Sequence, residues 1–400
     1  MIILFDVDGV LVENRAYRAG IQQTSLYFAG RLGLAARQPS DAEIDVLEAE
    51  SITVEWDSCA IVAAILLLER LGAEPGSGRR RAKAAGLARD FWQFLDELPT
   101  RKLKTTTIDF TLLARRVGAA ARETGLLPAR AALELFGQDL AHQSVVPPEV
   151  ALPLLDHLLG DVYNIDDSPA MQVFQNFVLG DEQYARYYGL PPRVTGEGLL
   201  EALDQPLLRL DLCQEVLARR AAGTLFPVIF TARPSLTPIE ASGFERGYTP
   251  ESEIARGQVG LQGVPALGIG KLDWFARRVG RAGSELVKPS PVHAMAAIGA
   301  ARSGLELEAI KAAVAVERGD HLRYPLTACA GENVHVFEDS PNSLRGVARA
   351  VELLNRQGLG LHLVRHGVAP AGSPKRETLA GVADHLHPDI NAGLETLFRN

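Results

Sequence analysis

The chain begins with a short apolar run that ends in two carboxylates. Residues 2–5 are Ile-Ile-Leu-Phe, and Asp6, Val7, Asp8 and Gly9 follow. Because side chains alternate along a strand, we expect Asp6 and Asp8 to share one face. Two carboxylates this close repel each other and are costly to bury, so we expect a cation between them, with Mg2+ as the candidate. Gly9 permits a sharp turn, and the pattern predicts metal-assisted chemistry at the carboxyl end of a buried strand.

Composition limits the classes of protein to consider. The chain has 400 residues, of which 47% are hydrophobic and 22% charged, so we expect two or three folded domains. A net charge of −8 argues against a general role at nucleic acid or at a membrane surface. The longest apolar stretch, residues 59–68, is too short to span a bilayer and predicts a buried helix.

The cysteines and the N-terminus indicate a compartment. Cys59, Cys213 and Cys329 are scattered and include no CxxC pair, which predicts neither a disulfide framework nor a zinc site. A reducing environment fits such cysteines. The N-terminus enters a strand directly, without the pattern of a signal peptide, so we expect a cytoplasmic protein.

Apolar periodicity divides the chain into a helical block and an alternating block. Residues 14–207 are rich in Ala, Leu, Glu and Arg at helical spacing, as in 129–136. Beyond them, short apolar strands alternate with helices, which predicts a parallel sheet covered on both faces. The first strand must join that sheet. We therefore predict an α/β, Rossmann-like core of residues 1–13 and 208–400, with residues 14–207 inserted as a helical domain.

Polar residues recur just after the predicted strands of the later block. The strands are expected at 226–230, 285–287, 334–337 and 360–364. The first three lead to Thr231, to Lys288, and to Glu338 with Asp339. Ligands of doubly wound sheets bind outside the carboxyl ends of the strands, so we expect these side chains to meet the two N-terminal acids in one crevice. A nucleophile, a second acid, a hydroxyl, an ammonium and metal-binding acids are the set that phosphoryl transfer needs.

Two helices are expected to begin at this crevice. Ser290 suits an N-cap and Pro291 the first helical position, and Ser340 and Pro341 repeat the arrangement. A helix N-terminus directed at the crevice favours a bound anion.

Four segments resemble, in the same order, the four motifs of the haloacid dehalogenase superfamily. They are residues 6–12 (Asp-Val-Asp-Gly-Val-Leu-Val), 230–234 (Phe-Thr-Ala-Arg-Pro), 287–291 (Val-Lys-Pro-Ser-Pro) and 337–343 (Phe-Glu-Asp-Ser-Pro-Asn-Ser). The resemblance covers the predicted core. The inserted block resembles the helical cap that many members carry after the first motif.

The resemblance implies a role for each matching catalytic residue. Asp6 would be the nucleophile that forms an aspartyl-phosphate. Asp8 would protonate the leaving group and then activate water. Thr231 and Lys288 would hold the phosphoryl oxygens.

The resemblance also implies a Mg2+ site. The metal would be bound by the Asp6 side chain, the Asp8 main-chain carbonyl and Asp339, with Glu338 beside it. Family members that act on carbon–halogen bonds typically lack the second acid, so Asp8 favours phosphoryl chemistry over dehalogenation.

Some segments depart from the family pattern or admit another interpretation. Ser343 stands where glycine is common, and residues 304–331 are expected to be an added helix and loop. Lys271 is a rival to Lys288, but it lies at an expected helix start, which predicts a solvated side chain. Residues 363–367, Leu-Val-Arg-His-Gly, resemble the signature of histidine phosphatases. Too little chain follows to build that domain, so we interpret them as the last core strand.

Near and within the inserted block, some residues are candidates for substrate contact, with core packing or surface exposure as the alternative. They are Arg15, Tyr17, Arg18, Glu55, Trp56 and Asp57. The run 79–81 (Arg-Arg-Arg) predicts a solvated loop, and residues 105–108 predict a short strand.

We therefore predict a Mg2+-dependent phosphomonoester hydrolase acting on a small phosphorylated metabolite, without nucleic-acid or membrane partners. The alternative is a phosphomutase, because the loop 338–342 (Glu-Asp-Ser-Pro-Asn) resembles members close to β-phosphoglucomutase. A non-catalytic binding protein is the third hypothesis. The substrate, the residues that select it and the oligomeric state do not follow from the sequence.

Overall fold

The computed structural model describes residues 1–73, 90–98, 108–142 and 146–399. The described chain divides into two compact units, Met1–Arg15 with Leu203–Asn400, and Ala16–Ala202. The sequence analysis placed the two junctions after residues 13 and 207, two residues earlier and five residues later. We refer to the first as the sheet unit and to the second as the helical unit, and each is described by itself.

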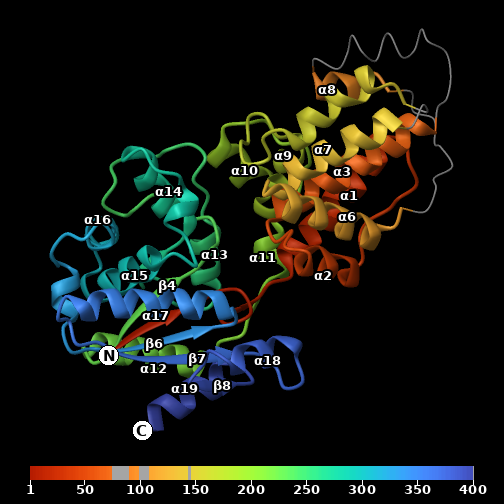
Figure 1. Ribbon diagram of the computed structural model, residues 1–400. Helices are drawn as coiled ribbons and strands as arrows, with labels where there is room; N and C mark the ends of the chain where they lie inside the picture. The colour runs from red at the N-terminus through yellow and green to blue at the C-terminus, as the bar shows by residue number, and fades with distance from the viewer. Residues whose placement is uncertain (74–89, 99–107, 143–145, 400) are drawn as a thin grey trace. The chain divides into compact units, whose positions relative to one another are not determined.

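The described residues of the sheet unit form a six-stranded parallel sheet in the order β5-β4-β1-β6-β7-β8 (Figure 1). The strands are β1 (Ile2–Phe5), β4 (Phe226–Phe230), β5 (Ala266–Leu267), β6 (Asn333–Glu338), β7 (His362–Val368) and β8 (His385–His387). The N-terminal strand β1 lies between β4 and β6, with Leu4 opposite Val228 and Val336. The predicted α/β, Rossmann-like architecture with the first strand inside the later sheet is consistent with this topology.

The helices of the sheet unit cover both faces of the sheet. They are α12 (Leu210–Ala221), α13 (Glu251–Gln258), α14 (Ile269–Arg278), α15 (Pro291–Ser303), α16 (Glu306–Glu317), α17 (Pro341–Arg356), α18 (Pro374–Ala380) and α19 (Ile390–Arg399), with 3-10 turns η1 (Gly283–Glu285) and η2 (Leu326–Cys329). Ile2 and Leu4 of β1 pack with α14 to α18 on one face, whereas Ile3 and Phe5 pack with α12, α13 and α19 on the other. This two-sided burial explains why β1 is a continuous apolar run.

One predicted strand is absent, and another differs in its bounds and in its place in the sheet. Residues 285–287 are not a strand, because the Glu285 carboxylate accepts hydrogen bonds from the Ala282 amide and from Arg281 and so stabilises η1. The strand predicted at 360–364 is β7, which continues to Val368, and it is not the last of the sheet because β8 follows it. The added helix and loop expected at 304–331 are α16 and η2.

A short ribbon forms where the chain leaves and re-enters the sheet unit. β2 (Val12–Glu13) pairs antiparallel with β3 (Gln205–Pro206). The Leu207 amide also donates to the Leu11 carbonyl, at 2.8 Å. The two connecting segments therefore hold each other in place beside the end of β1.

The described part of the helical unit is a set of α-helices, as predicted (Figure 1). They are α1 (Ala16–Arg31), α2 (Asp41–Ala49), α3 (Glu55–Gly72), α5 (Phe91–Asp96), α6 (Phe110–Thr124), α7 (Pro128–His142), α8 (Pro148–Leu159), α9 (Pro169–Leu179) and α10 (Asp181–Tyr188), with α11 (Leu199–Leu203) at the junction. The apolar stretch 59–68 lies in α3, whose residues 58–64 are all buried, as expected of a central helix. Within the described residues, no helix has the length and apolar character needed to cross a membrane. The run 79–81 and most of the segment 105–108 lie outside the described residues.

Candidate active site

The candidate site lies at the carboxyl ends of three neighbouring strands. Asp6 follows β1, and its amide still donates to the Phe337 carbonyl of β6 at 3.0 Å. Thr231 follows β4, and Glu338 is the last residue of β6. Parallel pairing of β4, β1 and β6 therefore brings these side chains to one edge of the sheet, as the sequence predicted.

Lys288 joins two of the predicted acids. Its Nζ atom lies 2.7 Å from Asp6 Oδ1 and 2.7 Å from Glu338 Oε2, and 4.3 Å from the centre of the Phe230 ring. Burial by itself lowers the pKa of the Lys288 ammonium. The nearby carboxylates of Asp6 and Glu338 raise this pKa by more than burial lowers it, so the pKa lies above its ordinary value. Lys288 is therefore a protonated cation beside the predicted nucleophile.

His293, in the first turn of α15, fixes the backbone at Lys288. His293 Nδ1 accepts the Lys288 amide hydrogen at 3.1 Å, and Nε2 lies 2.9 Å from the Leu267 carbonyl at the end of β5. A carbonyl only accepts, so Nε2 carries the proton. Burial lowers the pKa of His293 to about 3, which keeps the ring neutral and able to accept.

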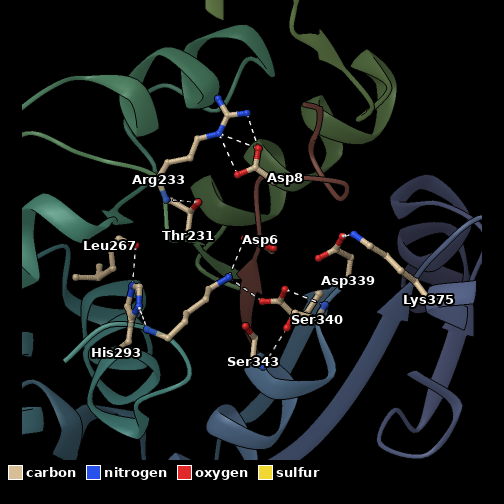
Figure 2. A network of polar contacts seen from close by, with 12 residues as sticks. Asp6, Asp8, Thr231, Arg233, Leu267, His293, Asp339, Ser340, Ser343 and Lys375 are labelled. Atoms are coloured by element: carbon tan, nitrogen blue, oxygen red, sulfur yellow. Dashed lines mark hydrogen bonds and ion pairs between the residues drawn. The ribbon is translucent and has the colours of Figure 1, made fainter. Parts of the chain in front are cut away.

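Three carboxylates form a group with the composition of a hard-metal site. Among the described residues, Asp6, Glu338 and Asp339 each offer an oxygen, and these oxygens all lie within 4.8 Å of one another. Burial and the charge of Asp6 raise the pKa of Glu338, and burial raises the pKa of Asp339, so positive charge is needed to keep the group ionised. An all-oxygen set of this kind fits Mg2+. The Nζ atom of Lys375 in α18 lies 2.6 Å from Asp339 Oδ2 and supplies part of that positive charge (Figure 2).

The sequence analysis expected a cation between Asp6 and Asp8, and in the structure each of the two carboxylates pairs with a different cationic side chain. The Asp8 carboxylate is bound by the Arg233 guanidinium, with Nε 3.0 Å from Oδ1 and 3.2 Å from Oδ2, and Nη2 2.6 Å from Oδ1 (Figure 2). The chain turns after β1, because the Val7 carbonyl accepts from the amides of residues 10–12. The two acids therefore have separate cationic partners, Lys288 for Asp6 and Arg233 for Asp8.

Thr231, two residues before Arg233, is completely buried. Its Oγ1 accepts the Arg233 amide hydrogen at 3.1 Å, which leaves the hydroxyl proton available for donation. The residue thus has the position that the sequence predicted and also shapes the turn that carries Arg233.

Two glycines allow the close approaches on which the site depends. Gly9 has φ +72°, and a Cβ there would lie 2.7 Å from Asp339 Oδ2. Gly346 in α17 would place a Cβ 2.3 Å from the Pro289 carbonyl oxygen, next to Lys288. No ordinary Cβ fits at either distance.

Both predicted helix caps are confirmed. Ser290 accepts from the Val292 amide at the start of α15, and Ser340 accepts from the Ser343 amide at the start of α17. Glu338 Oε1 accepts the Ser340 amide hydrogen at 3.2 Å, which ties the loop that follows β6 to the end of that strand. Ser343 lies in the first helical turn, where a residue with a side chain adopts the backbone conformation without strain.

The prediction that Lys271 is solvated was wrong. Its side chain is buried, with Nζ 3.0 Å from Glu253 Oε1 and 3.2 Å from Glu306 Oε2. The two glutamates also accept backbone amides, those of Leu236 and Ala266 among them. Lys271 therefore neutralises a structural acid pair and does not join the candidate site.

The histidine-phosphatase signature is part of a structural cluster. His366 on β7 lies between His335 on β6 and His387 on β8, with ring nitrogens 3.0 Å apart on each side. Its ring also stacks on Phe337, with centroids 4.3 Å apart. Arg365 pairs with Asp384. The segment is a core strand, as predicted.

Two proposed substrate contacts are interior residues of the helical unit. Asp57 is buried, accepts the Ala129 amide at the start of α7 and accepts the Tyr163 hydroxyl. Tyr17 is buried beside Phe174. For both residues the structure favours the alternative of core packing, because their side chains pack within their own unit. Arg18 is partly exposed and pairs with acids of α2.

The comparisons with known proteins bear on the fold. No family model matches the chain, and no curated protein sequence matches it. A crystal structure from the Northeast Structural Genomics Consortium, target ZR25, aligns over 99% of both chains with a TM-score of 0.64 at 15% identity. The phosphatase Tt82 from Thermococcus thioreducens aligns over 100% of both chains at 15% identity, with a TM-score of 0.43. The chain is therefore an α/β protein that shares its fold with a solved structure.

Proposed function

We propose that the protein is a Mg2+-dependent phosphomonoester hydrolase of the haloacid dehalogenase type, with the helical unit as its cap. The observation that carries the proposal is the placement of Asp6. Its carboxylate ends the inner strand β1 and is held by the buried Lys288 ammonium, within reach of Glu338 and Asp339. This arrangement combines a nucleophile, a cation for phosphoryl oxygens and an all-oxygen metal group.

The reaction would proceed in two balanced halves. In the first, an Asp6 oxygen attacks phosphorus, the bond to the leaving oxygen breaks, and Asp8 gives that oxygen a proton. In the second, water attacks the aspartyl-phosphate, Asp8 takes a proton from the water, and the bond from Asp6 to phosphorus breaks. Free phosphate leaves, and both carboxyl groups return to their initial states.

Positive charge and hydrogen-bond donors would stabilise the transferred group. Lys288 and the Thr231 hydroxyl would bind phosphoryl oxygens, where charge develops in the transition state. Asp6, Glu338 and Asp339 would hold Mg2+, which neutralises phosphate charge when it is bound. His293 keeps Lys288 in place through its backbone amide.

Phosphate release from a panel of phosphomonoesters tests this proposal. Wild type should release phosphate with Mg2+ and not after chelation, and Asp6→Asn should lose at least about 1,000-fold in kcat because an amide is a poor nucleophile. Release that survives in Asp6→Asn would contradict the proposal. An isomerised sugar phosphate without free phosphate would indicate the phosphomutase instead.

A further inference from the structure

The guanidinium of Arg233 is enclosed between carboxylates from two distant parts of the chain. One is Asp8, which receives its Nε and Nη2 hydrogens at 2.6–3.2 Å. The other is Asp204, whose Oδ2 lies 2.9 Å from Nη2. The side chain of Arg233 is 1% exposed and that of Asp204 is fully buried, whereas that of Asp8 is 33% exposed. The buried Arg233 guanidinium thus binds the partly exposed Asp8 carboxylate.

Both ends of this network are fixed by the backbone. The Arg233 amide donates to Thr231 Oγ1, and its carbonyl accepts from Ile269 at 3.0 Å. The other oxygen of Asp204 accepts the Arg15 amide hydrogen at 3.0 Å. Asp204 directly precedes β3, and Arg15 lies just after β2. The hydrogen bond between these two residues therefore lies beside the β2–β3 ribbon.

We infer that Arg233, anchored by Asp204, is a positioning residue that holds the Asp8 carboxylate for proton transfer; the inference rests on the proposed function. A planar guanidinium that binds a carboxylate through two nitrogens fixes direction as well as distance. Without it, a one-third-exposed aspartate gains rotamer freedom and spends less time where a leaving oxygen or a water can reach it. Arg233 contacts the Asp8 carboxylate and would act on the phosphoryl group only through it.

This role predicts a loss that depends on the leaving group. A phenolate activated by a nitro group leaves without a proton, whereas an unactivated phenolate needs one from Asp8 in the transition state. The value of kcat/KM covers only the steps up to formation of the aspartyl-phosphate, so it isolates proton donation. A merely structural defect would lower kcat/KM for both substrates by the same factor.

The experiment compares phenyl phosphate with 4-nitrophenyl phosphate in saturating Mg2+. The variant is Arg233→Met combined with Asp204→Asn, because Arg233→Met alone would remove the guanidinium that pairs with the buried Asp204 carboxylate. We expect kcat/KM to fall about 100-fold on phenyl phosphate and less than about fivefold on 4-nitrophenyl phosphate. Asp204→Asn alone, which keeps Arg233 on Asp8 but weakens its anchor, should show the same preference with a smaller loss.

The outcomes separate the inference from the proposed function. Equal losses on both substrates, in either variant, would overturn the positioning role while leaving the phosphatase intact. Wild type without turnover of either substrate would overturn the proposed function and the inference with it. Arg233→Lys supplies a further check, since an ammonium restores charge without the planar fork and should recover only part of the phenyl phosphate activity.

Discussion

Lys288 Nζ lies 2.7 Å from Asp6 Oδ1, and the same ammonium lies 2.7 Å from Glu338 Oε2. A buried lysine that joins the end of one strand to the end of its neighbour neutralises two acids that would otherwise repel. It also places a cation where the oxygens of a group attacked by Asp6 would lie. The proposed chemistry therefore depends on this contact.

Lys288→Met should abolish turnover, and Lys271→Met is its matched control. Both lysines are buried and each joins two carboxylates, so both changes should destabilise the protein by about 3 kcal/mol. Only Lys288 is proposed to bind the phosphoryl group, so folded Lys271→Met should keep the wild-type kcat. Urea unfolding and phosphate release measure the two effects. Equal kcat values for the two variants would contradict the assignment of Lys288.

Gly9→Ala should disrupt the metal group, with Gly331→Ala as control. Both glycines have φ +72°, so alanine costs about 1 kcal/mol of stability at each. A Cβ at Gly9 would also meet Asp339 Oδ2 at 2.7 Å, whereas a Cβ at Gly331 meets nothing within 4 Å. Turnover and Mg2+ affinity should fall at least tenfold only in Gly9→Ala. The same kinetics in both variants would show that the contact with Asp339 is unimportant.

Lys375→Gln should tighten Mg2+ binding. The Lys375 ammonium lies 2.6 Å from Asp339 Oδ2, so it repels a divalent ion bound to that carboxylate and competes for the oxygen. Removing the charge should lower the Kd for Mg2+ by about threefold to tenfold, measured by calorimetric titration without substrate. Lys375→Arg keeps the charge and should stay near wild type. An unchanged or raised Kd in Lys375→Gln would contradict this account.

Stability of the sheet unit should fall as pH decreases from about 6.5 to about 4. Burial lowers the pKa of His335 to about 4 and of His366 to about 3, both from an ordinary value of 6.5. Below pH 6.5 the unfolded state therefore binds more protons, and stability declines by on the order of 1 kcal/mol per pH unit for each histidine. Hydrogen exchange of β6 and β7 measures this dependence.

Variants at two histidines test the same prediction. His366→Phe removes one buried imidazole and should flatten the pH dependence, although it lowers stability at neutral pH by leaving ring nitrogens of its neighbours unpaired. His321→Gln changes an exposed histidine and should leave the slope as it is. An unaltered slope in His366→Phe would contradict the assignment.

The residues that end strands were predictable from the sequence, because apolar runs locate strands and parallel pairing aligns their carboxyl ends. Asp6, Thr231 and Glu338 belong to this group, and the structure brings them to one edge. The segment before Lys288 was mispredicted as a strand, since only two of the five residues between Gly283 and Pro289 are apolar, which is a weak strand signal. There the capping bonds of Glu285 decide in favour of a 3-10 turn.

Partners distant in the chain were not predictable. Arg233 lies within a recognised motif, but Asp204 lies in a block interpreted as helical, and nothing local connects them. Lys271 has the sequence context of a solvated helix start, and its buried partners are 18 and 35 residues away. His293 has the appearance of an ordinary helix residue, and only its bond to the Lys288 amide reveals its role. From a single sequence, the ends of helices and strands can be predicted better than the contacts between side chains that are distant in the chain.

Trapping the phosphorylated intermediate shows whether Asp6 carries the phosphoryl group, as we propose. The protein would be mixed with Mg2+ and 4-nitrophenyl phosphate, quenched in acid within milliseconds, digested with a protease and analysed by mass spectrometry. The account predicts one added phosphoryl group on the N-terminal peptide, located at Asp6, sensitive to hydroxylamine and absent in Asp6→Asn. Turnover accompanied by phosphorylation of another residue, or by none at any quench time, would contradict it.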